Sequence, residues 1–298
     1  MPNTIAGSWR GSVRAFVAVG AVVIATAVAV PAVSADPLWP GGPDIPGVSV
    51  PGSPSTPPPL ARANFSVPTF TPADGATVGI AQPIILTFDD AIDDRDAAQR
   101  AIRVTTRPAV AGHLYWAGNK QVRWKPDSGL WPAHTRVTVE AGKTKSAFTI
   151  GDAWVATADD NTHTVTVTVN GAMVRTMPTS MGSNVHPTPN GTYTVGERFR
   201  DMFMDSSTYG VPVDSPEGYR TYVEYATRIS AGGIFVHAAP WSVAQQGRSN
   251  TSHGCLNVSM DDGKWFYDNA PTGAPVIVRN TVGGRVDPGD GLTDFSAN

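Results

Sequence analysis

Cysteine is almost missing from this sequence, since Cys255 is the only one in 298 residues. One cysteine cannot form an internal disulfide, so no disulfide framework supports the fold. Positive charge is also scarce: lysine and arginine number 22 against 25 acidic residues and form no basic stripe, which argues against nucleic acid as a partner. Apolar residues still make up 41% of the chain, which is enough for globular cores.

The first 35 residues contain a charged, an apolar and a small-residue region in the order that is typical of a secretory signal. Arg10 and Arg14 precede an apolar run from Ala15 to Val30, and Val33-Ser34-Ala35 gives a small-residue cleavage pattern. The run is shorter than the ~20 residues that span a bilayer comfortably. No cysteine follows it closely, which excludes a lipid anchor. We therefore predict an exported protein whose residues 1–35 are a signal peptide or an N-terminal anchor, the one expected link to a membrane.

A spacer and a first domain are expected next. Residues 36–64 are rich in proline and glycine, a composition that buries too little apolar surface to fold, so we predict a linker. From residue 65 to residue 150 the pattern is one of short strands, as in residues 83–88, and residues 117–120 resemble a hairpin turn. This regular spacing predicts an immunoglobulin-like β-sandwich. The fold class is thus expected to be mainly β.

A second β-rich domain is expected over residues 151–282. Residues 162–169 alternate strictly, and Asn170-Gly171 predicts a type I′ turn into the next strand. Further strands are expected at residues 191–195, 233–237 and 274–278. Ser259 opens a short helix through about Asn269 with a capping-box pattern, and Met260, Trp265 and Phe266 are expected to face the sheet. Residues 283–298 are expected to form a loose C-terminal tail.

The single thiol has the neighbours of a reaction centre. Cys255 lies in the segment Ser252-His253-Gly254-Cys255-Leu256-Asn257, and His237 ends the apolar run that starts at Gly233. A lone cysteine is usually a small buried hydrophobe. Here a glycine and a histidine precede it in a polar, turn-rich stretch, which favours a nucleophile that needs a base within hydrogen-bond reach. Gly254 allows a tight turn, so that its N–H and that of Cys255 face a developing oxyanion.

The choice of base stays open on spacing alone. His237 and His253 both lie close enough in the pattern to serve, and His253 shares a face with Cys255 on an extended backbone. The other histidines are expected to be structural, exposed or in the first domain; they are His113, His134, His163 and His186.

These motifs together resemble those of the L,D-transpeptidases, which have a YkuD-type catalytic domain. The resemblance rests on His237, the fourteen residues that follow it and the six-residue block around Cys255. It covers about residues 150–282 and, more loosely, the domain before it. Further matching segments are Met204-Asp205-Ser206-Ser207-Thr208-Tyr209-Gly210, Gly218-Tyr219-Arg220 and His237-Ala238-Ala239-Pro240-Trp241-Ser242.

The resemblance implies a role for each matching position. His237 pairs with Cys255 and is oriented by the backbone carbonyl of Ala238, while His253 shapes the site. Tyr219 and Trp241 are expected to cover the pocket, with Met204 as a flexible apolar contact. The substrate-binding residues implied in this way are Tyr219, Gly232, Gly233, Asn257, Trp241, Met204 and Ser252.

The family implies a reaction on peptidoglycan stem peptides in the cell envelope. Cys255 attacks the third residue of a tetrapeptide stem, releases D-alanine and passes the acyl group to an acceptor amine, which gives a 3→3 cross-link. Carbapenem β-lactams are expected as inhibitors. No cofactor or metal is expected, since Asp89-Asp90 and Asp93-Asp94 lack the glycine and terminal glutamate of a calcium loop.

Three alternatives remain at this stage. A cysteine hydrolase or L,D-carboxypeptidase would use the same residues with water as acceptor. A wall-binding module would keep Cys255 without using it. A sortase-like transpeptidase would need an arginine beside the Cys–His pair.

Overall fold

The structure is a computed structural model and describes residues 58–296. The predicted signal segment and most of the predicted linker lie outside the described residues. Within them, strands greatly outnumber helices, which confirms the expected mainly β class. Neither α-helix of this part has the length and apolar content needed to cross a membrane.

The first domain is a sandwich of two four-stranded sheets, as the strand spacing predicts. One sheet has the order β1-β3-β6-β5 and the other β2-β8-β7-β4. Their inner faces share a core in which the Trp124 and Trp131 rings lie 5.0 Å apart. The elements are β1 (Thr69–Thr71), β2 (Thr77–Val78), β3 (Ile84–Thr87), α1 (Arg95–Arg100), β4 (Ile102–Arg107), β5 (Gly112–Trp116), β6 (Gln121–Pro126), β7 (Arg136–Ala141) and β8 (Thr144–Ile150).

The acidic stretch before α1 has a structural role that the sequence analysis did not assign. Asp94 is the N-cap of α1, and its carboxylate accepts a hydrogen bond from the Ala97 N–H at 2.9 Å. This bond satisfies one of the free N–H groups at the helix start. These aspartates were considered only for a calcium loop, and the short helix that follows them was not predicted.

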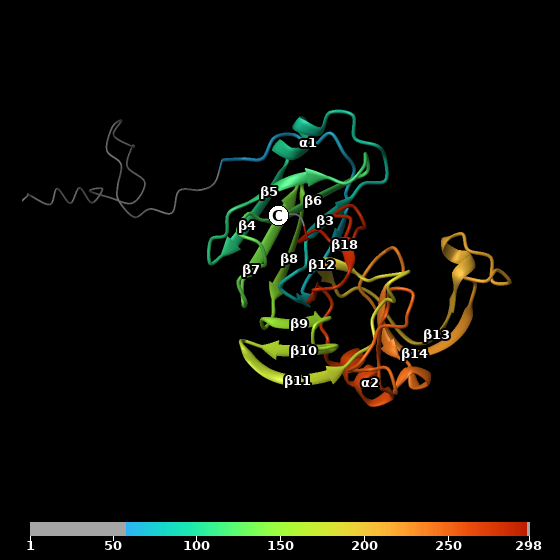
Figure 1. The fold of residues 1–298 in the computed structure, drawn as a ribbon. Helices are drawn as coiled ribbons and strands as arrows, with labels where there is room; N and C mark the ends of the chain where they lie inside the picture. The colour runs from blue at the N-terminus through green and yellow to red at the C-terminus, as the bar shows by residue number, and fades with distance from the viewer. Residues whose placement is uncertain (1–57, 297–298) are drawn as a thin grey trace, which may run out of the picture. The chain divides into compact units, whose positions relative to one another are not determined.

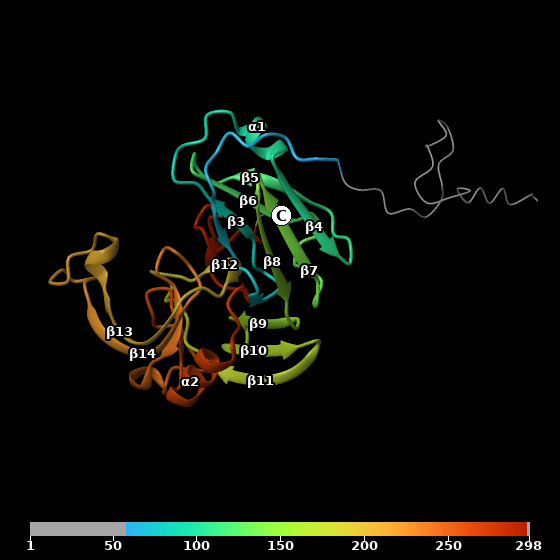
Figure 2. The same cartoon turned by 180° about the vertical axis from the view of Figure 1, so that it is seen from behind.

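A six-stranded sheet forms one half of the second domain, with the order β11-β10-β9-β17-β12-β18. β9, β10 and β11 lie side by side in Figures 1 and 2. Asn170 and Gly171 have φ of 50° and 85°, which confirms the type I′ turn between β10 and β11. His163 was expected on a strand, but it lies in the preceding turn with φ of 49°. The strands are β9 (Trp154–Asp159), β10 (Thr164–Val169), β11 (Ala172–Pro178), β12 (Pro189–Thr194), β17 (Pro275–Arg279) and β18 (Gly283–Arg285).

A second, four-stranded sheet with the order β13-β14-β15-β16 carries the reactive residues. β13 and β14 form a long curved hairpin in Figures 1 and 2, and β15 and β16 pair in parallel. Parallel neighbours require a crossover, which here runs from residue 239 to residue 255. The elements are β13 (Arg198–Asp205), η1 (Ser206–Tyr209), β14 (Arg220–Arg228), β15 (Phe235–Ala238), η2 (Pro240–Ser242) and β16 (Leu256–Val258).

Helix α2 (Met260–Asn269) packs against β14 and β15. Ser259 caps it, because its Oγ accepts a hydrogen bond from the Asp262 N–H at 3.1 Å, as the capping pattern predicts. Phe266 is fully buried and meets the Trp154 ring edge-on at 5.5 Å. The helix is thereby fixed behind the strand that carries His237.

The prediction of a loose tail after residue 282 is wrong for the part that the structure describes. β18 pairs with β12, and Asp294 is 5% exposed. Its carboxylate pairs with Arg123 of the first domain at 2.8 Å. Four glycines in residues 283–298 favour a loose segment, but the buried ion pair holds it in place.

Candidate active site

Strand register brings Cys255 and His237 to the same face of the sheet. Val236 pairs with Leu256, and His237 pairs with Asn257. Side chains alternate along a strand, so Val236 and Leu256 point into the core while their neighbours point the other way. Cys255 lies one residue before β16 and therefore faces the same side as His237 and Asn257.

A pocket of about 380 Å³ opens on that face. Its lining contains eight of the residues singled out from the sequence, including both histidines proposed as base and the thiol. No lysine, arginine, aspartate or glutamate lines it, so the pocket carries little fixed charge. Those eight residues are Met204, Tyr219, His237, Trp241, Ser252, His253, Cys255 and Asn257.

His237 is held in one orientation by its own strand. Its Nδ1 lies 2.9 Å from the Ala238 carbonyl oxygen, which fixes the proton on Nδ1 and makes Nε2 the nitrogen that can accept a proton. Burial lowers the pKa of His237 to about 4, although the bonds to Ala238 and to the Asn257 side chain act in the opposite direction. The imidazole is therefore neutral at pH 7 and can accept a proton at Nε2.

The thiol is buried and protonated at rest. Cys255 is 8% exposed, and burial raises its pKa to about 11. Its Sγ donates a long hydrogen bond of 3.8 Å to the Gly233 carbonyl. No hydrogen bond joins Cys255 to His237 among the residues that the structure describes. The pair is thus two neutral groups in one pocket, and not a preformed thiolate–imidazolium pair.

His253 lines the same pocket and packs against other aromatic rings. Its ring stacks on His186 with centroids 4.6 Å apart and lies 5.0 Å from the Tyr219 ring. Burial is the main cause that lowers its pKa, and the neighbouring His186 adds to it. These contacts suit a residue that shapes the pocket wall.

Ser252 ties the reactive turn together and corrects one sequence-based assignment. Its Oγ donates to the Cys255 carbonyl at 2.6 Å and accepts from the Gly254 N–H at 3.1 Å. The Gly254 N–H was expected to face an oxyanion, but it is already occupied by Ser252. Gly254 is required for another reason: its φ of 119° is one that side-chain-bearing residues rarely adopt.

The two glycines before β15 have different roles in the structure. Gly233 contacts the thiol through its carbonyl, as the 3.8 Å bond shows. Gly232 was expected to line the donor site, but it does not line the pocket. Its N–H instead donates to Asp290 at 2.8 Å, which anchors the turn to the C-terminal segment.

Five lining residues were given no role from the sequence, although Ser242 lies in one of the matching segments. Thr221 and Val223 follow Tyr219 at every second position along β14 and so share its face, but the strand itself was not predicted. The others come from the crossover between β15 and β16, where no periodicity exists to reveal them; they are Ser242, Gln245 and Thr251.

A buried thiol, a neutral imidazole and an uncharged pocket on a β-sheet fit the class of cysteine-dependent acyl-transfer enzymes. Comparison with known families narrows this class. A bacterial Ig domain model matches residues 57–146, and a model of the L,D-transpeptidase catalytic domain matches residues 153–278. The chain belongs to the L,D-transpeptidase family.

Curated relatives and solved structures agree with this assignment. L,D-transpeptidase 2 of Mycobacterium tuberculosis is 50% identical over 248 residues, which cover 78% of this chain and 60% of that protein. L,D-transpeptidase 1 of the same organism is 42% identical over 71% of this chain and 84% of its own length. A structure of LdtMt1 in complex with imipenem has a TM-score of 0.68 at 42% identity and covers 71% of this chain and 97% of that one.

A third match comes from L,D-transpeptidase 3 of Mycobacterium tuberculosis in complex with a faropenem-derived adduct. Its TM-score is 0.66 at 40% identity, over 73% of this chain and 99% of that one. The chain therefore spans nearly the whole of two solved relatives, but 60% of the length of L,D-transpeptidase 2.

Proposed function

We propose that this protein is a peptidoglycan L,D-transpeptidase in which Cys255 is the nucleophile and His237 the base. One observation carries the proposal: His237, whose imidazole is anchored through Nδ1 on the Ala238 carbonyl, lines the pocket that also contains the chain's single thiol. The family membership supplies the reaction class, and the pocket supplies the residues.

The first half of the reaction forms a thioester. The Cys255 Sγ–H leaves the Gly233 carbonyl and passes its proton to His237 Nε2 as Sγ attacks the carbonyl carbon of the third stem residue. The tetrahedral intermediate then breaks its bond to the terminal D-alanine, whose amine takes the proton back from His237. Because both groups start neutral, no charge has to be stored in the buried pocket before substrate binds.

The second half returns the thiol. The side-chain amine of another stem attacks the thioester, His237 takes a proton from that amine, and Cys255 leaves as a thiol, which gives the 3→3 cross-link. Water competes with the amine, so the thioester has to be sheltered. Tyr219 and Trp241 line the pocket and suit this covering role.

The proposal extends to inhibitors and place of action. Relatives solved with imipenem and with a faropenem-derived adduct support a β-lactam that acylates Cys255 in this chain too. Peptidoglycan lies outside the cytoplasm, so we propose that the protein acts in the cell envelope after export.

Two of the alternatives differ from this proposal in measurable ways. A cysteine L,D-carboxypeptidase would use the same thioester and release it to water. A sortase-like enzyme relies on an arginine beside the Cys–His pair, and the lining of this pocket has none. The acceptor is therefore the point to test.

The experiment follows the intact mass of the protein during incubation with a tetrapeptide stem. We expect a covalent adduct equal to the stem minus D-alanine, absent from the Cys255→Ala protein. Addition of an acceptor stem is expected to convert the adduct into cross-linked dimer. Free tripeptide as the only product, with acceptor in excess, would assign the hydrolase instead.

A further inference from the structure

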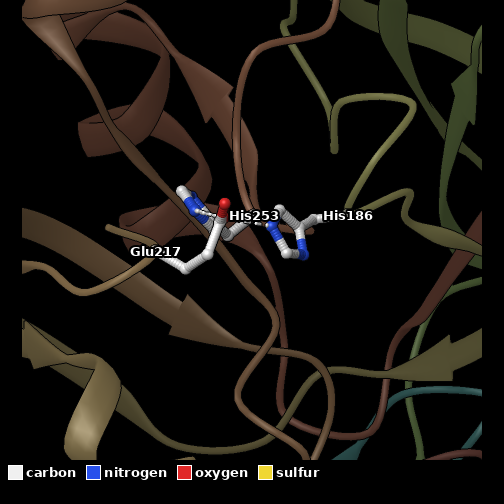
Figure 3. A group of neighbouring side chains, drawn as sticks. All are labelled: His186, Glu217 and His253. Atoms are coloured by element: carbon white, nitrogen blue, oxygen red, sulfur yellow. Dashed lines mark hydrogen bonds and ion pairs between the residues drawn. The ribbon is translucent and has the colours of Figure 1, made fainter. Parts of the chain in front are cut away.

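Three side chains of the kind that bind metal ions meet at the rim of the active-site pocket. They are His186, Glu217 and His253, and their ligand atoms all lie within 4.8 Å of one another. Figure 3 shows the three side chains pointing toward a common point from three separate segments. His186 comes from the loop before β12, Glu217 from the loop before β14, and His253 from the turn before Cys255.

The geometry is close to that of a metal site. His186 Nε2 lies 2.9 Å from Glu217 Oε2, and His253 Nε2 lies 4.0 Å from the same oxygen. Tetrahedral zinc with bonds of about 2.0–2.1 Å sets its ligand atoms about 3.3 Å apart. The first distance must open and the second must close, each by less than about 1 Å, and the two histidine nitrogens, which lie within 4.8 Å of each other, must also come closer. Glu217 is 60% exposed and lies on a loop, so its side chain can make this adjustment.

The ligand set also selects the ion. Two imidazoles and one carboxylate are borderline ligands that suit zinc and similar transition-metal ions better than calcium or magnesium, which prefer oxygen. The three residues leave one tetrahedral position open. Two imidazoles and one carboxylate carry one negative charge in total. A divalent cation neutralises this charge and leaves the site with one positive charge.

The stacked histidines are hard to explain as an ion pair alone. One pair with Glu217 accounts for a single imidazole, whereas two rings stack here with centroids 4.6 Å apart and both bring a ligand atom near the same carboxylate. A metal ion accounts for both rings, because it can bind one nitrogen of each together with the carboxylate. No other group of three such residues is close enough to hold an ion in the part of the chain that the structure describes.

We propose that His186, Glu217 and His253 bind a zinc-class divalent cation at the pocket rim and that the bound ion slows acylation of Cys255. His253 lines the same pocket as Cys255. Glu217 lies two residues before Tyr219, the residue that we propose covers this pocket. The ion joins the loop to the reactive turn and so restricts entry of an acyl donor. The effect on acylation rests on the proposed function, whereas the binding itself does not.

The first experiment measures binding without activity. Zinc chloride is titrated into the full chain carrying Cys255→Ser, because this variant removes the thiol as a metal ligand. The heat of binding and the competition with a chromophoric chelator measure the affinity. We expect one site per chain. His186→Ala and Glu217→Gln, each added to Cys255→Ser, are expected to weaken it by at least about 10-fold, the scale known for disturbed metal sites.

A matched control comes from the first domain. His113 and Asp127 form an exposed pair at 2.6 Å that resembles one edge of the proposed site but has no third ligand. His113→Ala is therefore expected to leave zinc affinity unchanged. Equal affinity in the His186→Ala, Glu217→Gln and His113→Ala proteins, all folded by circular dichroism, would overturn the site. Cobalt substitution adds a check, since its visible absorption reports the tetrahedral coordination that we expect.

The second experiment tests the effect on the thiol. Acylation of the protein by a carbapenem is followed by mass with and without zinc, and a chelator is added afterwards. We expect zinc to slow the wild-type protein by about 10-fold, reversibly, and to leave His186→Ala unaffected, because that protein keeps Cys255, His237 and His253. Equal slowing of both proteins would mean that zinc acts on Cys255 directly and would overturn the regulatory role. Failure of acylation in zinc-free protein would instead count against the proposed function and leave the binding result standing.

Discussion

At the scale of single residues, burial acts on the reactive pair in opposite directions. It lowers the pKa of His237 and raises that of Cys255, so each group is neutral over a wide pH range. A buried charge is costly unless it is paired. The neutral resting pair therefore keeps the pocket stable, and the charged pair forms only while substrate is attacked.

The identity of the base gives the first prediction. His237→Ala is expected to lower the acylation rate by more than about 100-fold, the usual scale of general acid–base help. His253→Ala is expected to lose less, because its ring stacks on His186 and Tyr219. Single-turnover acylation by a carbapenem, followed by mass, measures both variants. A larger loss in His253→Ala would transfer the role of base to His253.

The pH dependence of acylation gives the second prediction. With pKa values of about 4 for His237 and about 11 for Cys255, both groups stay neutral between those limits. We expect a flat rate from about pH 6 to 9 and a decline as pH falls toward the lower limit, because a protonated imidazole cannot accept the thiol proton. A pH–rate profile checks this. A rate that climbs tenfold per unit toward the ordinary thiol pKa of about 8.5 would show that free thiolate attacks without His237.

At the scale of elements, the parts that could be predicted have strong local signals. Strict alternation predicts β10, the Asn170-Gly171 pair predicts its turn, and Ser259 predicts the start of α2. β13 and β14 were missed, because their side chains lack a simple alternation of buried and exposed positions.

The candidate site likewise contains residues that the sequence predicts and residues that it does not. Cys255, His237 and their immediate neighbours are marked by a motif in the sequence. The cluster of His186, Glu217 and His253 depends on three loops that meet only in the folded chain. Residues 31 and 36 positions apart give no local signal of contact, so no sequence pattern predicts this cluster.

The contact between α2 and β15 gives the third prediction. Gly263 lies within α2, and a Cβ added there would stand 2.8 Å from the Ala238 nitrogen. Replacing glycine by alanine inside a helix normally stabilises by about 1 kcal/mol. Here we expect Gly263→Ala to cost about 1–3 kcal/mol, because the helix must shift away from β15. Acylation is expected to slow as well, since the Ala238 carbonyl orients His237.

Denaturant unfolding and acylation rates measure both effects. Gly284→Ala is the matched control, since a Cβ there would have no atom within 4 Å and the backbone angles suit alanine. A Gly263→Ala protein that is more stable than wild type would show that α2 and β15 are not in close contact.

At the scale of the whole molecule, the C-terminal segment connects the two domains. Asp294 accepts hydrogen bonds from Arg123 Nη1 at 2.8 and 2.9 Å, and Lys125 donates to its backbone carbonyl. Phe295 packs against the core of the first domain. The first domain also binds the second through the Gly79 N–H, which donates to the Thr272 carbonyl at 2.8 Å. Stability is therefore shared across the two domains, whereas every residue proposed for catalysis lies after residue 200.

This division gives the last prediction, for a truncated protein that begins at Gly151. Loss of the first domain exposes Phe295 and leaves Asp294 without Arg123, so the unfolding temperature is expected to fall by several degrees. Asp294→Ala in the full chain is the matched comparison; it leaves a buried Arg123 unpaired and is expected to cost about 3 kcal/mol. Both proteins are expected to keep Cys255 reactive toward a carbapenem, while the truncated one loses efficiency on intact sacculi. If truncation abolishes acylation in a chain still folded by circular dichroism, the first domain contributes to the site itself, because the reach of the catalytic domain plays no part with so small a substrate.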